Sequence, residues 1–230
     1  MATRPPEQPP ASGPASERVR LRRRRERGSH DRRVIDAILD EAMIAHLGFA
    51  DETGSPLVIP TLFARSGDRV YFHGSVSSRT LRALAAGAPV CLTVSLLDGL
   101  VLARSAMHHS ANYRSVMLMG QAVMIEEPAQ KLAAFETIVE HMIPGRWRDV
   151  RRPSANELKA TAVLALGIDE VSAKVRTGPP LDDEQDYSLE VWAGVIPLAM
   201  VAGTPREDPR LGKGIEPPAY ASAYRREGRP

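Results

Sequence analysis

The spacing of apolar and polar residues along the chain predicts short helices inserted between many extended segments. Val34, Ile38 and Ala42 recur every four residues after Asp31, which is the repeat of one helix face. Extended runs follow, separated by turns that contain glycine, at residues 46–50, 56–64 and 69–73. Successive hairpins of this kind indicate an antiparallel meander.

The remainder of the chain continues this pattern. Further β-rich runs lie at residues 89–97, 100–105, 115–125, 161–166 and 170–176. Asp98-Gly99 is a tight-turn signal between the first two of these runs, and Tyr187 to Gly194 is predicted to form one or two helical turns. Helix starts are predicted at Ser77 or Ser78, at Pro128 and at Ser154.

Seven or eight strands, mostly neighbours in sequence and with helices between only some of them, predict a mainly β fold. The architecture expected is an antiparallel β-barrel with peripheral helices. Strands and helices do not alternate regularly, and neither G-x-G-x-x-G nor G-x-x-x-x-G-K-[ST] occurs, which argues against a doubly wound nucleotide-binding sheet. A composition of 43% apolar and 25% charged residues fits a folded domain with its own core.

The distribution of proline and charge divides the chain into three parts. Residues 1–16 are rich in proline and are predicted to be a disordered tail, residues 17–204 form one domain, and residues 205–230 form an irregular C-terminal extension. Residues 1–33 hold ten arginines against four acidic residues, a charge of +6, so the rest carries −4 of the total of +2. A body with net negative charge argues against nucleic acid as a partner. We interpret the arginine-rich segment as a solubilising lead into the first helix.

Cysteine content and hydropathy exclude several classes of protein. With Cys91 as its one cysteine, the chain cannot hold an intramolecular disulfide or a cluster of thiolates. No apolar run approaches the roughly 20 residues that a membrane span requires, and the N-terminus lacks the apolar core of a secretory signal. We therefore expect a cytoplasmic protein with no membrane partner.

The densest polar segment runs from Tyr71 to Arg79, where a strand is predicted to give way to a helix. Serine hydroxyls, the Arg79 guanidinium and free backbone N–H groups converge at such a helix start, which suits a phosphate. Gly74 allows the backbone to be approached closely. Serine-capped helices are common, so the pattern alone fits a structural cap as well as a phosphate site.

A second polar segment, residues 104–115, contains the adjacent His108 and His109. Neighbouring residues on a strand point to opposite faces, and no cysteine or carboxylate stands at metal-ligand spacing. No metal site is therefore predicted. His30, His46 and His141 are isolated in the sequence and are interpreted as structural or exposed.

Taken together and in order, these motifs resemble the pyridoxamine 5′-phosphate oxidase-like superfamily of FMN-binding split barrels, in particular its nitroimidazole-resistance branch. The resemblance extends from Arg27 to Pro197. It rests on the motifs Arg27-Gly-x-x-Asp31, Pro56-Leu-Val-Ile-Pro-Thr61, Tyr71-Phe-His-Gly74, Ser78-Arg79, His108-His-Ser-x-Asn-Tyr-Arg-Ser-Val116 and Trp192-x-Gly-x-x-Pro197. It implies a split β-barrel of six to eight antiparallel strands and a homodimer that holds FMN at the interface between its subunits.

The resemblance also assigns residues to the cofactor. These are Val58, Ile59, Pro60, Thr61, Phe72, His73, Gly74, Ser78, Arg79, Asn112, Ser115 and Trp192. Val58–Thr61 and Phe72–Gly74 would surround the flavin ring, Ser78 and Arg79 would bind its phosphate, and the last three would lie near the seam between subunits. Thr80 replaces a phosphate-binding lysine of the family, for which Arg104 or Arg114 would compensate.

The same resemblance implies an FMN-dependent oxidoreductase with His73 as its catalytic residue. After Trp192 the stretch 195–200 is apolar and lacks the Arg and His that grip the substrate phosphate in the vitamin-forming oxidases. A small aromatic, quinone or nitro electron acceptor is therefore favoured over pyridoxamine phosphate. Two alternatives stay open: a flavin carrier without turnover, and a haem-binding split barrel with His73, His108 or His109 as axial ligand.

Overall fold

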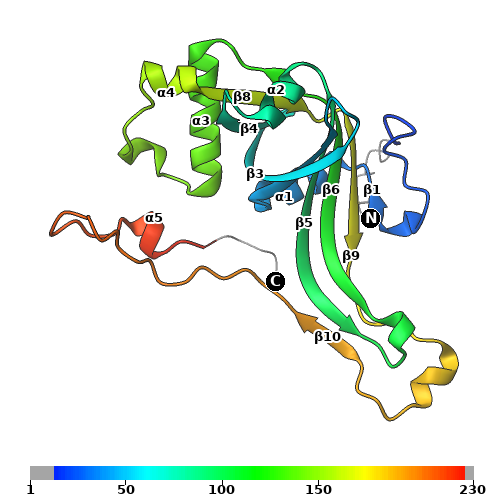
Figure 1. The fold of residues 1–230 in the computed structure, drawn as a ribbon. Helices are drawn as coiled ribbons and strands as arrows, with labels where there is room; N and C mark the ends of the chain where they lie inside the picture. The colour runs from blue at the N-terminus through cyan, green and yellow to red at the C-terminus, as the bar shows by residue number, and fades with distance from the viewer. Residues whose placement is uncertain (1–12, 226–230) are drawn as a thin grey trace, which may run out of the picture.

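One open antiparallel sheet forms the centre of the structure, a computed structural model that describes residues 13–225. Most of the predicted N-terminal tail (1–12) and the end of the predicted extension (226–230) lie outside the described residues. Over the described range the sheet has ten strands in the order β1-β9-β6-β5-β2-β3-β4-β8-β7, with β10 paired to β5 (Figure 1). The mainly β, split-barrel class is confirmed.

The strands differ widely in length. They are β1 Gly28–Ser29, β2 Ile44–Ala50, β3 Pro56–Ser66, β4 Arg69–Ser75, β5 Pro89–Leu102, β6 Ser110–Gln121, β7 Val123–Met124, β8 Thr161–Gly167, β9 Glu170–Arg176 and β10 Gly194–Pro197. Seven of these strands are longer than four residues. The strands beyond the predicted six to eight are therefore short pairings at the edges of the sheet.

Four of the five α-helices in residues 13–225 begin where the sequence predicts them, whereas the fifth lies in the C-terminal segment predicted to be irregular. The five are α1 Arg32–Glu41, α2 Arg79–Ala85, α3 Pro128–Met142, α4 Ala155–Ala160 and α5 Ala219–Ser222. The Asp31 carboxylate accepts a hydrogen bond from the N–H of Arg33 (2.9 Å), and Ser154 with Glu157 forms a capping box. Over residues 13–225, no helix has both the length and the hydropathy of a membrane-spanning segment.

The main core lies between the inner face of the sheet and α1. Ile35, Ile38 and Leu39 of α1 are buried against inward-facing residues of the central strands. A second, smaller cluster lies beneath α3, where Ala134 and Phe135 pack against the opposite face of β4 and β8. The two helices therefore cover different faces, and part of the outer face of β2, β3 and β5 carries exposed side chains.

Strands β5 and β6 continue beyond the core as a long hairpin, here called the arm (residues 96–114), to which β10 is added (Figure 1). The predicted turn at Asp98-Gly99 is wrong. Strand β5 is continuous, and its register with β6 shifts between Leu97 and Gly99. A Cβ at Gly99 would lie 3.1 Å from the Ile196 carbonyl oxygen, so the glycine admits β10 rather than a turn.

The chain after the arm returns to the body of the molecule. The helical turns predicted for 187–194 are replaced by a 3₁₀ helix, Glu184–Ser188, and the start of β10. Beyond β10 a segment without regular structure, here called the strap (residues 198–217), runs back to α5 (Figure 1). The Tyr220 hydroxyl donates to Asp149 (2.7 Å) and the Tyr224 hydroxyl donates to the Met142 carbonyl (2.9 Å). The strap is thus anchored at one end by the pairing of β10 with β5 and at the other end by the hydrogen bonds of Tyr220 and Tyr224.

Candidate functional site

The predicted flavin-ring segment lies where the sheet splits between β3 and β4. Residues 63–66 of β3 pair with β4, whereas residues 56–62 pair only with β2. Within the described part of the chain no strand covers the other edge of 56–62, so alternate N–H and C=O groups there face a gap. Residues 73–75 of β4 pair with β8 and border the same gap. The fold therefore brings Val58–Thr61 and His73–Gly74 to the two sides of one opening.

His73 is held in an apolar setting at this gap. Its ring packs edge-on against Phe135 of α3, with 5.3 Å between ring centroids. Its Nδ1 is buried and has no hydrogen-bond partner among residues 13–225. Burial lowers the pKa of His73 below its ordinary value, so the imidazole is neutral at pH 7. The side chain of Phe72, by contrast, is fully buried in the core and cannot reach a cofactor.

The predicted phosphate-binding pair follows directly at the start of α2. The Ser78 hydroxyl caps α2 by accepting from the N–H of Leu81 (3.4 Å), and Arg79 is exposed. Among the described residues Arg79 has no ion-pair partner, and its charge helps to lower the pKa of Asp51, after the larger effects of hydrogen bonds from Thr53 and Ser55. Arg79 is thus an available cation near Asp51, in the turn between β2 and β3.

Gly74 has a packing role that the sequence did not reveal. A Cβ there would lie 2.8 Å from Leu81 Cδ1, so the missing side chain admits α2.

The other predicted cofactor residues lie elsewhere in the chain. Ser115 is on β6 between Ser95 and Lys174. Asn112 is buried at the base of the arm, where its amide donates to the Gly178 carbonyl (3.2 Å) and accepts from Arg176. Trp192 is 66% exposed just before β10. One chain does not bring these three residues to the gap between β3 and β4, and their assignment stays a prediction that requires a second subunit.

Neither arginine suggested as a substitute for the missing lysine is free. The Arg114 guanidinium donates to both oxygens of Asp98 (2.6 and 2.9 Å) and to both oxygens of Glu41. Hydrogen bonds to these two carboxylates raise the pKa of Arg114 well above its usual value. Arg104 donates to Asp182 (3.1 Å) and lies over the ring of Tyr187. Both cations are therefore committed to acidic groups of their own chain.

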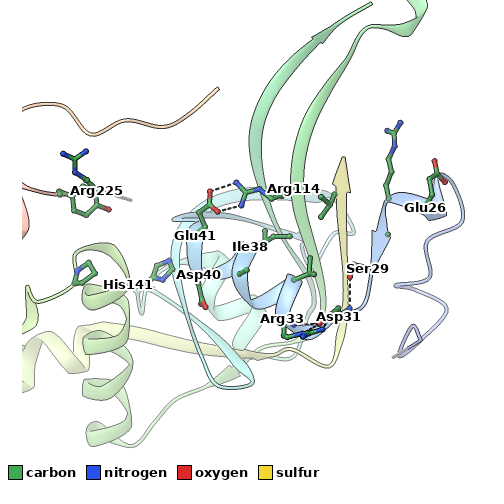
Figure 2. A pocket seen from close by; sticks show the side chains of 17 residues that line it. Glu26, Ser29, Asp31, Arg33, Ile38, Asp40, Glu41, Arg114, His141 and Arg225 are labelled. Carbon is green, nitrogen blue, oxygen red and sulfur yellow. Dashed lines mark hydrogen bonds and ion pairs between the residues drawn. The ribbon is translucent and has the colours of Figure 1, made fainter. Parts of the chain in front are cut away.

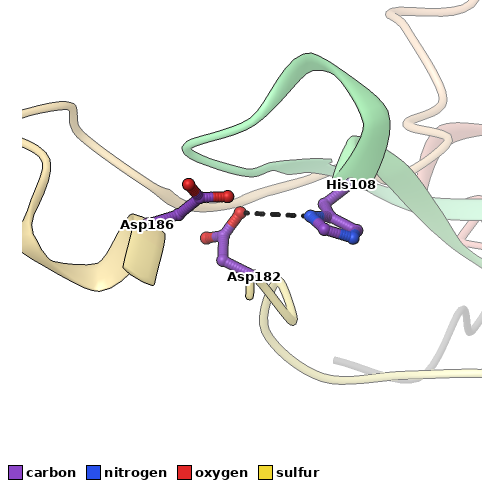
Figure 3. A group of neighbouring side chains, drawn as sticks. All are labelled: His108, Asp182 and Asp186. Carbon is purple, nitrogen blue, oxygen red and sulfur yellow. Dashed lines mark ion pairs between the residues drawn. The ribbon is translucent and has the colours of Figure 1, made fainter. Parts of the chain in front are cut away.

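The arm tip joins a histidine to carboxylates that are distant in sequence. His108, Asp182 and Asp186 present ligand atoms within 4.8 Å of one another (Figure 3). Asp182, however, already accepts from the Arg104 and Ser105 N–H groups (3.0 and 3.3 Å) as well as from the Arg104 side chain. Burial opposes ionisation, but these hydrogen bonds lower the pKa of Asp182. Its oxygens are occupied, so the cluster fastens the loop after β9 to the arm tip.

A cavity in the described residues lies apart from the gap. It measures about 1320 Å³ and lies between α1, the base of the arm and the end of α3 (Figure 2). The pairs Arg33–Asp31 and Arg114–Glu41 line it, together with apolar residues such as Ile38. None of the predicted cofactor residues belongs to its lining.

Comparison with known families and curated proteins gives one match. The family model described as pyridoxamine 5′-phosphate oxidase matches residues 31–175, which include the gap, α2 and the whole arm. No curated protein sequence matches the chain.

Three of the solved structures that resemble the chain are between 26% and 45% identical to it. The flavocytochrome Anf3 from Azotobacter vinelandii is 45% identical over 93% of this chain and 99% of that one, with a TM-score of 0.88. The FAD and heme binding protein from Mycobacterium smegmatis is 36% identical over 86% and 96%, with a TM-score of 0.82. A putative 5-nitroimidazole antibiotic resistance protein from Bacteroides thetaiotaomicron is 26% identical over 63% and 84%, with a TM-score of 0.54.

Proposed function

The chain belongs to the pyridoxamine 5′-phosphate oxidase family, and from that premise we propose that it is a redox protein that binds a flavin and a haem. The main support for flavin binding is the opening between β3 and β4. On its two sides, the backbone groups of Val58–Thr61 and of His73 that face the opening have no strand partner among the described residues. Polar flavin-ring edges need such donors and acceptors. The Arg79 guanidinium supplies the positive charge that a ribityl phosphate requires.

The flavin portion that this opening would hold is common to FMN and FAD. The sequence predicts FMN, whereas one relative at 36% identity is described as binding FAD. A bound flavin supplies two-electron chemistry to a small acceptor of the aromatic, quinone or nitro class, and the chain's residues position it. His73, neutral and packed on Phe135, would border the ring as the catalytic residue.

The haem is the second part of the proposal, and one observation favours it. Two relatives that align with 86–93% of the chain are described as a flavocytochrome and as a FAD and heme binding protein. The haem-binding alternative and the flavin-binding interpretation then describe one protein with two cofactors. A homodimer, as the family resemblance implies, would bring Asn112, Ser115 and Trp192 of a second subunit toward the flavin.

The absorption spectrum of freshly purified protein tests both cofactors. Flavin bands together with an intense Soret band are expected, and mass spectrometry of the released ligand distinguishes FMN from FAD. The absence of flavin bands in protein supplied with riboflavin and FAD would refute the first part, and the absence of a Soret band in protein supplied with haem would refute the second. Acceleration of reoxidation by quinones or nitroaromatics over free flavin would distinguish an enzyme from a carrier.

Arg79→Ala tests the phosphate assignment. A charge-assisted hydrogen bond to phosphate contributes about 1.5–3 kcal/mol, so flavin affinity is expected to fall about tenfold or more. Arg82→Ala, one turn further along α2, is the matched control and should leave affinity unchanged. Equal affinities of the two variants in a fluorescence titration would show that Arg79 does not hold the phosphate.

A further inference from the structure

The cavity between α1 and the base of the arm is large enough for a second cofactor (Figure 2). Its volume is about 1320 Å³, whereas pockets for small molecules usually measure about 300–1,000 Å³. Its walls come from the segment before α1, from α1 itself, from β6 and β9, and from the residues that follow α3 and α5. A planar macrocycle such as haem therefore has room here, apart from the gap assigned to the flavin.

One wall of this cavity is an apolar stripe of α1. Ala37 and Ile38 follow Val34 by three and four residues, so the three side chains lie on one side of the helix, and all of them line the cavity. Pro144 and Val175 add apolar surface from just after α3 and from β9. Cofactor sites are lined mainly by such apolar side chains, and this wall therefore suits one flat face of a porphyrin.

The charged residues of the lining favour an anionic ligand. Three of its carboxylates are already neutralised by arginines, in the pairs Asp31–Arg33, Asp40–Arg65 and Glu41–Arg114. Arg27 and Arg225 also line the cavity, and among residues 13–225 neither has an ion-pair partner. Figure 2 shows Arg225 on the α3 side of the cavity, where His141 also lies. Guanidinium groups are suitable partners for the two propionates of a haem, which are carboxylates.

His141, in the last turn of α3, is the one histidine among the described residues that line the cavity. Its Nε2 lies 2.7 Å from the Ala42 carbonyl oxygen, and its ring centroid lies 5.6 Å from that of Phe63. A metal-binding histidine usually donates one ring N–H to a carbonyl or carboxylate, and this bond decides which nitrogen carries the lone pair for the metal. Because a carbonyl only accepts, Nε2 carries the proton and Nδ1 is the nitrogen that would coordinate iron.

The other histidines do not line this cavity. His30 makes the same kind of contact, with its Nδ1 3.1 Å from the Val171 carbonyl oxygen, but the pocket beside it measures only about 310 Å³. That volume is near the lower limit for a small-molecule site. His73, His108 and His109, which the sequence suggested as axial ligands, are also absent from the lining. Within residues 13–225, His141 therefore combines an oriented ring with a cavity of the required size.

We propose that the cavity between α1 and the base of the arm holds the haem and that His141 is an axial ligand of its iron. This inference rests on the proposed function, since it requires that the chain binds haem. None of the residues predicted to bind the flavin lines this cavity, so within one chain the two cofactors would occupy separate sites.

The experiment titrates haem into the full chain and records absorption and EPR spectra for the wild type and three single variants. His141→Ala should lose the wild-type Soret band and the EPR signal of the ligated iron while keeping the flavin bands, and added imidazole should restore them. Ala37→Trp should fill the cavity and lower haem affinity at least tenfold with His141 intact; Ala37 is exposed, so the core is not disturbed. His30→Ala is the matched control and should keep the wild-type spectra and affinity.

Each other outcome has a separate meaning. A wild-type Soret band and EPR signal in His141→Ala would overturn the assignment, as would their loss in His30→Ala with His141→Ala unaffected. Wild-type protein that shows flavin bands but takes up no haem would instead remove the haem part of the proposed function, and the inference with it. If His141→Ala fails to fold, Ala37→Trp still decides, because unchanged haem affinity there would exclude this cavity.

Discussion

Replacement of Arg114 by methionine tests how the arm is joined to the body. The Arg114 guanidinium bridges Glu41 at the end of α1 and Asp98 at the register shift in β5, and the three side chains are only 15–28% exposed. Methionine keeps most of the volume and removes the charge. Two sheltered carboxylates are then left facing each other without their common cation.

The expected loss follows from that burial. Breaking a buried ion pair by removing one partner costs about 3–5 kcal/mol, whereas exposed pairs contribute about 1 kcal/mol or less. The Arg114 ion pairs are sheltered but not fully buried, so Arg114→Met should lower the free energy of unfolding by about 3 kcal/mol. For a chain of this length that corresponds to a fall in melting temperature of about 6–12 °C.

Urea unfolding and thermal denaturation of Arg114→Met and wild type measure this loss. Arg151→Met is the control, because its ion pair with Glu157 is 72% and 50% exposed, and its melting temperature should fall by no more than about 2–4 °C. In the triple variant with Glu41→Gln and Asp98→Asn, removal of all three charges should recover part of the stability. A loss below about 1 kcal/mol in Arg114→Met would refute the reasoning.

Two further predictions concern single positions. His73→Phe should raise the free energy of unfolding by about 1 kcal/mol, because it removes a buried nitrogen that has no partner. Burial lowers the pKa of His73, so just below about pH 6.5 the unfolded imidazole takes up a proton and the folded one does not. Wild-type stability should therefore fall as the pH drops through this range. Parallel pH profiles of the wild type and His73→Phe would contradict this. Gly99→Val should detach β10 from β5, seen as faster hydrogen exchange at 194–197, and unchanged protection would show that β10 does not need the close approach.

Local signals in the sequence predicted local structure well. Asp31, Pro128 and the Ser154–Glu157 capping box mark helix starts, and all three are observed. The reason is that a capping side chain bonds to a backbone N–H within three residues of it, so the signal is local in the sequence.

Predictions failed where a distant segment decides the structure. Asp98-Gly99 has the composition of a turn, but Gly99 is needed because β10, almost a hundred residues later, passes close to it. The carboxylate that organises the arm tip, Asp182, is 78 residues away from Arg104. For the same reason the sequence could name Val58–Thr61 through a resemblance but could not reveal that one edge of this segment is unpaired.

The strap has a consequence for how damage to the protein would be detected. Residue 198 follows the β10 pairing, and residues 220 and 224 are tied to the other end of the molecule by tyrosine hydroxyls. The two hydrogen bonds together contribute about 1–3 kcal/mol, which is less than the roughly 4 kcal/mol or more that holding a separate chain costs. A protease that hydrolyses one peptide bond between 198 and 217 would therefore release the C-terminal piece, and native mass spectrometry would detect the loss without denaturation.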